Sequence, residues 1–166
     1  EFVMVDPRYG KYFNIGKADI NGIELETSAT WGKWDARLSA TWMDAINKTD
    51  DYRSGERLPN RPEWEGCLRI NRRFLKDDAA TAFAELRYTG DNYYDSVGTI
   101  KMDDLLTVGL GLKWKFQKNM SVVAGVDDRF DKSPDVNMYA VYNGPSRTMW
   151  YPLQGRTWYV TLTWEF

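Results

Sequence analysis

The sequence predicts an all-β protein, an antiparallel up-and-down meander of about seven strands that cross a membrane. Apolar and polar residues alternate with a period of two in seven runs, which places successive side chains on opposite faces of a strand. The connections between the runs alternate between short and long. Large aromatic residues gather at the ends of the runs, on the apolar face.

Composition excludes several other classes. The chain has 166 residues, 43% of them hydrophobic, which suits one folded domain. No apolar stretch approaches the roughly 18 residues of a membrane helix. The net charge of -2 argues against a nucleic-acid partner, and one Cys with no His excludes a disulfide scaffold, a Ser-His-Asp triad and an imidazole metal site. We therefore expect no cofactor, no metal and no catalysis.

The first two runs form a predicted hairpin. Residues 22–31 alternate from Ile23 to Trp31, residues 32–33 (Gly-Lys) make a tight turn, and residues 34–42 alternate again. A polar stretch from Asn47 to Pro62, rich in Asp, Arg, Gly and Pro, predicts a long loop.

The third and fourth runs form a second predicted hairpin. The third extends from Trp64 to Arg73, residues 76–78 (Lys-Asp-Asp) make the turn, and the fourth covers residues 81–88. Phe83 breaks the pattern because it falls on the polar side. A second long polar connection is expected from Gly90 to Asp104.

The last three runs show the clearest alternation. Residues 106–116 lead through a turn at 117–119 into a run at 122–129. A third long loop is expected at about residues 132–156, and the final run covers residues 157–166.

Two environments compete for the apolar face: the core of a soluble sandwich, or lipid. Short turns at one end and long loops at the other are typical of outer-membrane barrels. Rings at both ends of the strands, with smaller side chains between them, fit the two aromatic girdles of a bilayer. The predicted girdle residues are Trp31, Trp34, Trp42, Trp64, Trp114, Phe116, Trp158, Trp164 and Phe166.

Charge follows the same division. The polar face carries most of the ionisable residues of the runs, whereas the apolar face carries only Arg72 and Asp128, each near a strand end. A charge in the middle of a membrane costs about 2–4 kcal/mol for Arg or Lys and little at the interface. The distribution therefore favours lipid on the apolar face.

Several local patterns resemble those of TonB-dependent outer-membrane receptors. They are the strand opening Tyr12-Phe13-Asn14-Ile15-Gly16-Lys17-Ala18 with Asn21-Gly22-Ile23-Glu24-Leu25-Glu26, the loop exit Gly55-Glu56-Arg57-Leu58-Pro59-Asn60-Arg61-Pro62, the strand end Asp128-Arg129-Phe130-Asp131-Lys132, and Tyr151-Pro152-Leu153-Gln154-Gly155-Arg156-Thr157-Trp158-Tyr159. At Asp128 and Arg129 the chain departs from the family's Asn-Leu. The resemblance covers nearly the whole chain.

The resemblance implies that residues 1–166 are a C-terminal segment of a 22-stranded barrel in the bacterial outer membrane, without the plug domain. It also implies several partners: the lipid bilayer, the remainder of the barrel and the plug, the TonB system through the missing N-terminal part, and the outer-membrane insertion machinery. The last of these would recognise the final strand, which ends at Phe166 with alternating apolar residues before it.

The function implied by the resemblance is import of a scarce nutrient, such as an iron–siderophore complex, a corrinoid or a glycan. Aromatic rings stack on rings and sugars, and Arg binds carboxylates or phosphates in a fork. The candidate ligand contacts in the long loops are Tyr52, Arg53, Arg57, Arg61, Tyr93, Tyr94, Tyr139, Tyr142, Arg147, Trp150 and Tyr151.

Three alternatives remain at this point. One is a soluble β-sandwich or barrel that binds carbohydrate. A second is a small closed eight-stranded outer-membrane barrel, with Phe2-Val3-Met4-Val5 as the eighth strand. An enzyme could use Glu24 and Glu26, which share a strand face about 7 Å apart, but the alternation of polar residues produces this spacing without catalysis.

Overall fold

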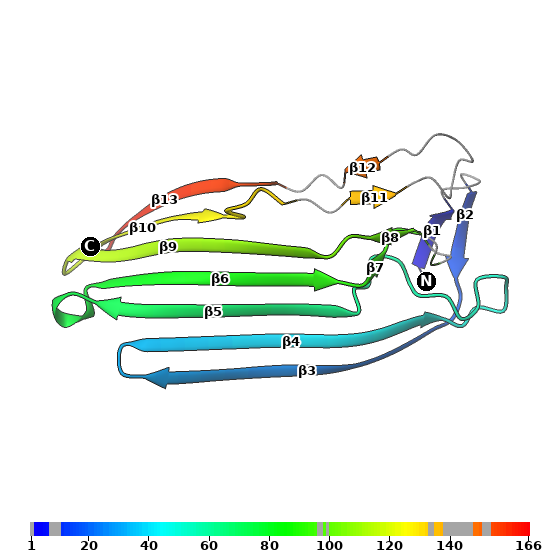
Figure 1. Cartoon of the computed structure of the whole chain (residues 1–166), viewed down its shortest axis with the longest axis horizontal. Helices are drawn as coiled ribbons and strands as arrows, with labels where there is room; N and C mark the ends of the chain where they lie inside the picture. The colour runs from blue at the N-terminus through cyan, green and yellow to red at the C-terminus, as the bar shows by residue number, and fades with distance from the viewer. Residues whose placement is uncertain are drawn as a thin grey trace.

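The main feature of the molecule is a seven-stranded antiparallel sheet in the order β13-β10-β9-β6-β5-β4-β3 (Figure 1). The computed structural model describes residues 2–6, 11–95, 98, 100–132, 135–137, 148–150 and 154–166. The strands of the sheet are β3 (Ala18–Trp31), β4 (Trp34–Asn47), β5 (Trp64–Phe74), β6 (Ala80–Gly90), β9 (Leu105–Gln117), β10 (Met120–Asp127) and β13 (Thr157–Trp164). This arrangement confirms the predicted up-and-down meander of seven strands.

The first hairpin is longer than its alternation predicts. β3 and β4 each have 14 residues, and Ala18 pairs with Asn47 at the far end of the ladder. The apolar–polar alternation is lost over residues 18–21 and 43–47, although the backbone ladder continues. Outside the hydrocarbon both faces of a strand can meet water, so pairing no longer requires an alternating sequence.

Short and long connections lie at opposite ends of the sheet (Figure 1). Gly32 takes a φ of +57° in the first tight turn, and the second contains the short helix η1 (Lys76–Asp78). The long connections carry four short strands, β7 (Asn92–Tyr93), β8 (Lys101–Met102), β11 (Asp135–Asn137) and β12 (Thr148–Trp150). Among the described residues, no helix is long and apolar enough to cross a membrane.

The N-terminal segment does not add an eighth strand to the sheet, so the alternative of a small eight-stranded barrel is wrong. β1 (Phe2–Asp6) pairs with β2 (Lys11–Ile15) in a separate two-stranded sheet near the long connections (Figure 1). Five residues are too few for a transmembrane strand, which needs about 9–11. The edge strands β3 and β13 are not paired with each other, so the described part of the chain forms an open sheet rather than a small closed barrel.

No segment of the described part of the chain covers the apolar face of the sheet. Leu110, Leu162 and Trp164 are 41%, 61% and 63% exposed. A soluble sandwich would bury these side chains under a second sheet. The four-stranded sheet β12-β11-β8-β7 is instead part of the long connections and lies beyond the end of the strands (Figure 1). The apolar face is therefore available to lipid.

The register shows that the two aromatic rows run obliquely across the strands. Following the pairing from strand to strand, Trp158 on β13 lies in the same cross-strand row as Ala36 on β4. Trp42, the belt residue of β4, is six residues from Ala36, so the belt shifts by six residues over the five strand steps from β4 to β13. At about 3.3 Å per residue and 4.8 Å per strand, this shift corresponds to a tilt of about 40°.

The row at the short-turn end shifts in the same direction. Trp164 lies four residues beyond the level of Trp34 over the same five steps, which corresponds to a tilt of about 30°. Transmembrane barrels have a similar strand tilt, about 35–45°. The two rows therefore behave as nearly level belts on tilted strands.

Phe83, which breaks the alternation, packs on the polar face beside a glycine. It pairs with Gly111, and a Cβ built on Gly111 would lie 2.2 Å from Phe83 Cζ. Gly125, the next residue in this row, has Tyr159 in the equivalent position, with the hydroxyl 2.5 Å from a built Cβ. The two glycines therefore leave space that two rings fill.

We predict that a charge on the apolar face destabilises the protein according to its level between the belts. Leu110→Arg, near the middle, should lower the free energy of unfolding by about 2–4 kcal/mol, and Leu106→Arg, near the belt at the long-loop end, by about 0–1 kcal/mol. Denaturant unfolding of the intact protein in lipid vesicles measures both. Equal losses would contradict the placement of lipid on this face.

Candidate functional site

The first long connection, residues 48–63, folds back on the end of β4. The backbone N–H of Asn47 donates to the Glu56 carbonyl at 2.8 Å, and that of Leu58 donates to the Ala45 carbonyl at 2.9 Å. The Leu58 side chain is buried against Ala45. This connection therefore has a defined shape and can hold side chains in fixed positions.

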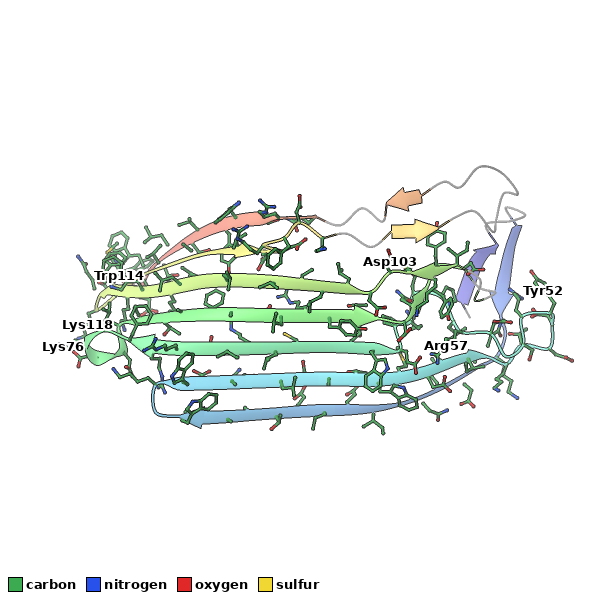
Figure 2. The ribbon with its side chains drawn as sticks, viewed as in Figure 1. Tyr52, Arg57, Lys76, Asp103, Trp114 and Lys118 are labelled. Carbon is green, nitrogen blue, oxygen red and sulfur yellow. The ribbon has the colours of Figure 1, made fainter. Side chains whose placement is uncertain are left out.

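Asp51 and Arg53 form a clamp within this connection. The Asp51 carboxylate accepts the backbone N–H of Arg53 at 2.9 Å and the Arg53 Nε–H at 3.0 and 3.1 Å, and it also pairs with Arg53 Nη2. Arg53 is only 4% exposed, whereas Tyr52 is 69% exposed and lies 5.5 Å from the guanidinium carbon (Figure 2). Arg53 thus stabilises the loop, and the loop exposes the Tyr52 side chain to its surroundings.

Arg57 links the loop to the strand ends. Its Nη2 lies 2.8 Å from Glu63 Oε2 and 3.6 Å from Asp44 Oδ1. The other Glu63 oxygen accepts the Trp42 Nε1–H at 3.0 Å. The indole of Trp42 therefore directs its polar edge toward the loop while its ring belongs to the aromatic belt. Both guanidinium contacts are ion pairs within the protein, so Arg57 stabilises the conformation of the loop against the strand ends.

Arg61 has a different environment. It is exposed, and its Nη1 donates only to the Asn60 carbonyl, at 3.0 Å, with no carboxylate partner among the described residues. Tyr93 is half-buried, and Tyr94 packs against the buried pair Ile100 and Met102. Of the six candidates in the first two loops, Tyr52 and Arg61 are the two exposed side chains.

The second long connection is held by Asp104 and Asp91. Asp104 accepts the Tyr88 hydroxyl at 2.8 Å and the backbone N–H of Asp91 at 3.1 Å. These two hydrogen bonds hold the pKa of Asp104 below its usual value, and the bond from the Tyr88 hydroxyl has the larger effect. The Asp91 carboxylate accepts from Lys101 Nζ and raises the pKa of Lys101.

The acidic residues of this connection do not converge on a metal site. Asp91 is paired with Lys101, and Asp95, 1% exposed, accepts the backbone N–H of Ile100 at 2.7 Å. In the part of the chain that the structure describes, no group of three or more acidic or thiol side chains is placed to hold a metal ion.

The long connections are joined to one another. Asn60 N–H donates to the Tyr93 carbonyl at 2.8 Å, which links the first to the second, and Met102 pairs with Val136, which links the second to the third. Four candidates, Tyr139, Tyr142, Arg147 and Tyr151, lie outside the described residues, and Trp150 is the last residue of β12. Together the described parts of these connections form one layer at the end of the sheet.

A chain of polar contacts crosses the other face, from the level of the short-turn belt toward mid-height. Asn71 donates to Asp35 at 2.8 Å and accepts from Arg69 Nε at 3.2 Å, and Arg69 Nη1 lies 3.0 Å from Glu85, which also pairs with Arg87. The Arg69 guanidinium also stacks 4.1 Å from the centroid of the Phe83 ring. This network joins β4, β5 and β6 on the polar face.

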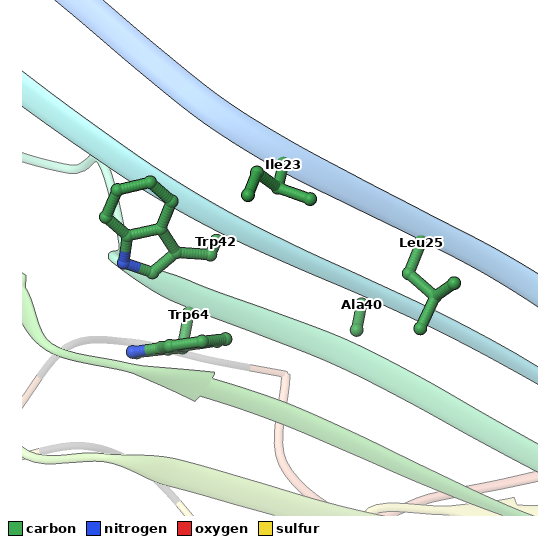
Figure 3. A pocket seen from close by; sticks show the side chains of 5 residues that line it. All are labelled: Ile23, Leu25, Ala40, Trp42 and Trp64. Carbon is green, nitrogen blue, oxygen red and sulfur yellow. The ribbon is translucent and has the colours of Figure 1, made fainter.

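An apolar groove of 390 Å³ lies on the opposite face, lined by Ile23, Leu25, Ala40, Trp42 and Trp64 (Figure 3). It exists because small residues, Ala40 and its neighbour Gly66, lie between larger side chains in one row. Its lining belongs to the lipid-facing side, so a lipid chain, rather than a polar ligand, suits it.

The residues that shape the loop layer were missed by the sequence analysis. Asp44, Asp51 and Glu63 bind the arginines, and Thr49 Oγ1 accepts the backbone N–H groups of Gly16 and Lys17 at 3.2 and 3.3 Å. An Asp two residues before an Arg, as at positions 51 and 53, was the one local signal available.

Residues 2–128 match the family described as TonB dependent receptor-like, beta-barrel. Among curated proteins, the chain is 28% identical over 153 residues to the vitamin B12 transporter BtuB of Vibrio vulnificus, a match that covers 92% of this chain and 22% of the relative. It is 26% identical over 137 residues to the pesticin receptor of Yersinia pestis, covering 80% of this chain and 20% of that protein.

Among solved structures, the fold is similar to that of the ferric yersiniabactin uptake receptor FyuA from Yersinia pestis. The TM-score is 0.73 at 19% identity, over 90% of this chain and 24% of that one. The chain therefore spans about a fifth to a quarter of the proteins that it resembles.

We predict that the clamp orders the first loop. Arg53→Gln should speed amide hydrogen exchange over residues 48–57 by about tenfold, because a truncated clamp leaves the buried Asp51 contact unmade. Arg61→Gln is the matched control and should leave exchange unchanged, since Arg61 pairs with no described carboxylate. Equal effects of the two changes would refute this role for Arg53.

The same clamp predicts a dependence on pH. The Arg53 side chain, bonded to the Asp51 carboxylate, holds the pKa of Asp51 below its usual 3.8. A lowered pKa contributes stability that is present above the unfolded value and lost as the pH falls through the folded one. The protection of residues 48–57, which is the exchange rate relative to the intrinsic rate at the same pH, should therefore fall only below about pH 3.8. Loss of protection between pH 5 and 7 would be inconsistent with the clamp.

Proposed function

Because this chain belongs to the TonB-dependent receptor-like β-barrel family, we propose that it forms the C-terminal part of the wall of an outer-membrane transporter that imports a scarce nutrient, such as an iron–siderophore complex. The protein is a bacterial outer-membrane β-barrel protein, and its family is one of receptors and transporters rather than enzymes. Membership of the family is established by the match, and we propose in addition the class of nutrient and the transport of that nutrient by the whole receptor.

The exposed apolar face is the observation that carries the proposal. A sheet with hydrocarbon-compatible side chains on one face and an ionic network on the other separates lipid from a watery interior. The first two connections carry aromatic and cationic side chains at one end of the sheet, and in our proposal these face the interior. This is the arrangement that a wall around a ligand pathway requires.

The relatives support import of a bulky nutrient. One is a vitamin B12 transporter and another is a ferric yersiniabactin uptake receptor. Tyr52 and Arg61 offer an exposed ring and a guanidinium with no carboxylate partner among the described residues, and such groups stack on and bind ligands of this kind. We include Tyr139, Tyr142, Arg147, Trp150 and Tyr151 of the third connection in the proposed ligand surface.

The remaining partners are part of the same proposal. A plug domain would lie against the polar face, TonB would act through the part of the receptor outside this chain, and the insertion machinery would recognise the strand that ends near Phe166. The alternating apolar residues of β13 support the last of these.

Uptake by the full-length receptor tests the function. Cells that express it as their only such receptor should accumulate radiolabelled cyanocobalamin or ferric yersiniabactin, and deletion of TonB should abolish the uptake. Uptake that persists without TonB would reject the proposal. Entry of neither probe would reject these two nutrients.

We predict that the two exposed loop residues contribute to ligand affinity. Tyr52→Ala and Arg61→Gln should each weaken half-saturation of uptake by about two- to tenfold, equivalent to a contact of about 0.5–1.5 kcal/mol. Lys118→Gln, at the opposite end of the sheet (Figure 2), is the control and should leave half-saturation unchanged. If both loop changes were silent, Tyr52 and Arg61 would not be ligand contacts.

A further inference from the structure

Arg72 is a charged residue on the lipid-facing side of the sheet. The register places it on the apolar row that contains Trp31, Trp34 and Ala82, at the end of the hairpin β3–β4. Its side chain is exposed. The aromatic belt at the short-turn end passes through this row, so Arg72 lies at the level of the membrane interface, where a charge costs little.

The guanidinium of Arg72 contacts a ring and no acceptor. Its carbon lies 5.1 Å from the centroid of the Trp34 ring, and among the described residues no carboxylate or carbonyl accepts a hydrogen bond from it. Contact with a ring occupies the flat face of a guanidinium and leaves the N–H groups on its edge free. These donors need a partner outside the protein.

The adjacent arginine provides an internal comparison. Arg73 faces the polar side, where its Nη2 donates to the Gly32 carbonyl at 3.0 Å and its Nη1 lies 3.9 Å from Asp78. The described part of the chain therefore supplies acceptors for Arg73 and only a ring for Arg72. This difference follows from the face that each residue occupies.

The neighbours of Arg72 leave room for a ligand. Trp31 and Trp34 are 51% and 38% exposed on one side, and Ala82, a small residue, lies on the other. Aromatic rings at this level contact the acyl chains and glycerol region of lipids. A molecule held here by Arg72 would therefore have an apolar part along the two rings.

We propose that Arg72, Trp34 and Trp31 bind the phosphate headgroup of a membrane phospholipid in the leaflet at the short-turn end. The guanidinium fork matches two phosphate oxygens, and Trp34 holds it in place. Trp31 and Trp34 contact the attached chains. The site is separate from the loop layer and takes a lipid, not the transported nutrient.

Lipid titration of the delipidated full-length receptor in detergent tests the proposal. Native mass spectrometry would count bound dioctanoyl phosphatidylglycerol for the wild type and for Arg72→Gln, with Arg37→Gln as the matched control. Arg37 is also exposed and has no ion pair among the described residues, but it lies on the polar face. Arg72→Gln should weaken the tightest binding step about five- to tenfold, and Arg37→Gln should not change it.

Further arms distinguish the source of the phosphate and guard against a misfolded variant. Inorganic phosphate at the same concentration should not displace the lipid, and displacement would overturn a lipid site. Arg72→Lys keeps the charge but loses the fork, so it should weaken binding by about two- to threefold. Wild-type affinity in both Arg72 variants, or an equal loss in Arg37→Gln, would also overturn the proposal.

Discussion

The whole structure depends on the fact that hydrocarbon offers no hydrogen-bond partners to a polypeptide backbone. Every N–H and C=O in the spanning region must then pair with a neighbouring strand, and only side chains can vary with the environment. Inside the sheet the strands meet this constraint with ladders such as Ala18–Trp31 against Trp34–Asn47, and among the described residues only the outer edges of β3 and β13 lack a partner strand. A slip of one residue would turn Glu24 and Glu65 toward lipid. At about 2 kcal/mol or more for a charge near mid-membrane, several such residues select one register.

This constraint also explains why the sheet was predictable and the loop layer was not. Alternation from Leu106 to Phe116 reports directly on two environments, and β9 was found almost to the residue. In the loops no environment repeats with a fixed period. Arg53 and Arg61 are the same residue type in the same loop, yet one is buried on Asp51 and the other is exposed. The Asp two residues before Arg53 was the only local sign of this difference, and the burial of Arg53 depends on how residues 48–63 fold back on β4.

Two departures from the expected pattern have local physical causes. Phe83 falls on the polar face because Gly111 leaves room for its ring and Arg69 stacks on it. Phe2–Asp6 resembles a strand and is one, but its partner is Lys11–Ile15 rather than an edge of the large sheet. The sequence pattern predicted both the polar-face position of Phe83 and the strand at residues 2–5. Their neighbours depended on the space beside Gly111 in the first case and on the short length of the strand in the second.

The edges and the polar face both indicate that this sheet needs further structure around it. β3 and β13 each have one unpaired edge, and unpaired backbone groups in hydrocarbon cost several kcal/mol each. Glu24 and Glu26 on β3 have no ion-pair partner among the described residues. Arg69, two strands away, already binds Asn71 and Glu85. Further strands beside both edges and a polar body against the inner face would satisfy these groups. The relatives, about four times as long as this chain, have the length to provide both.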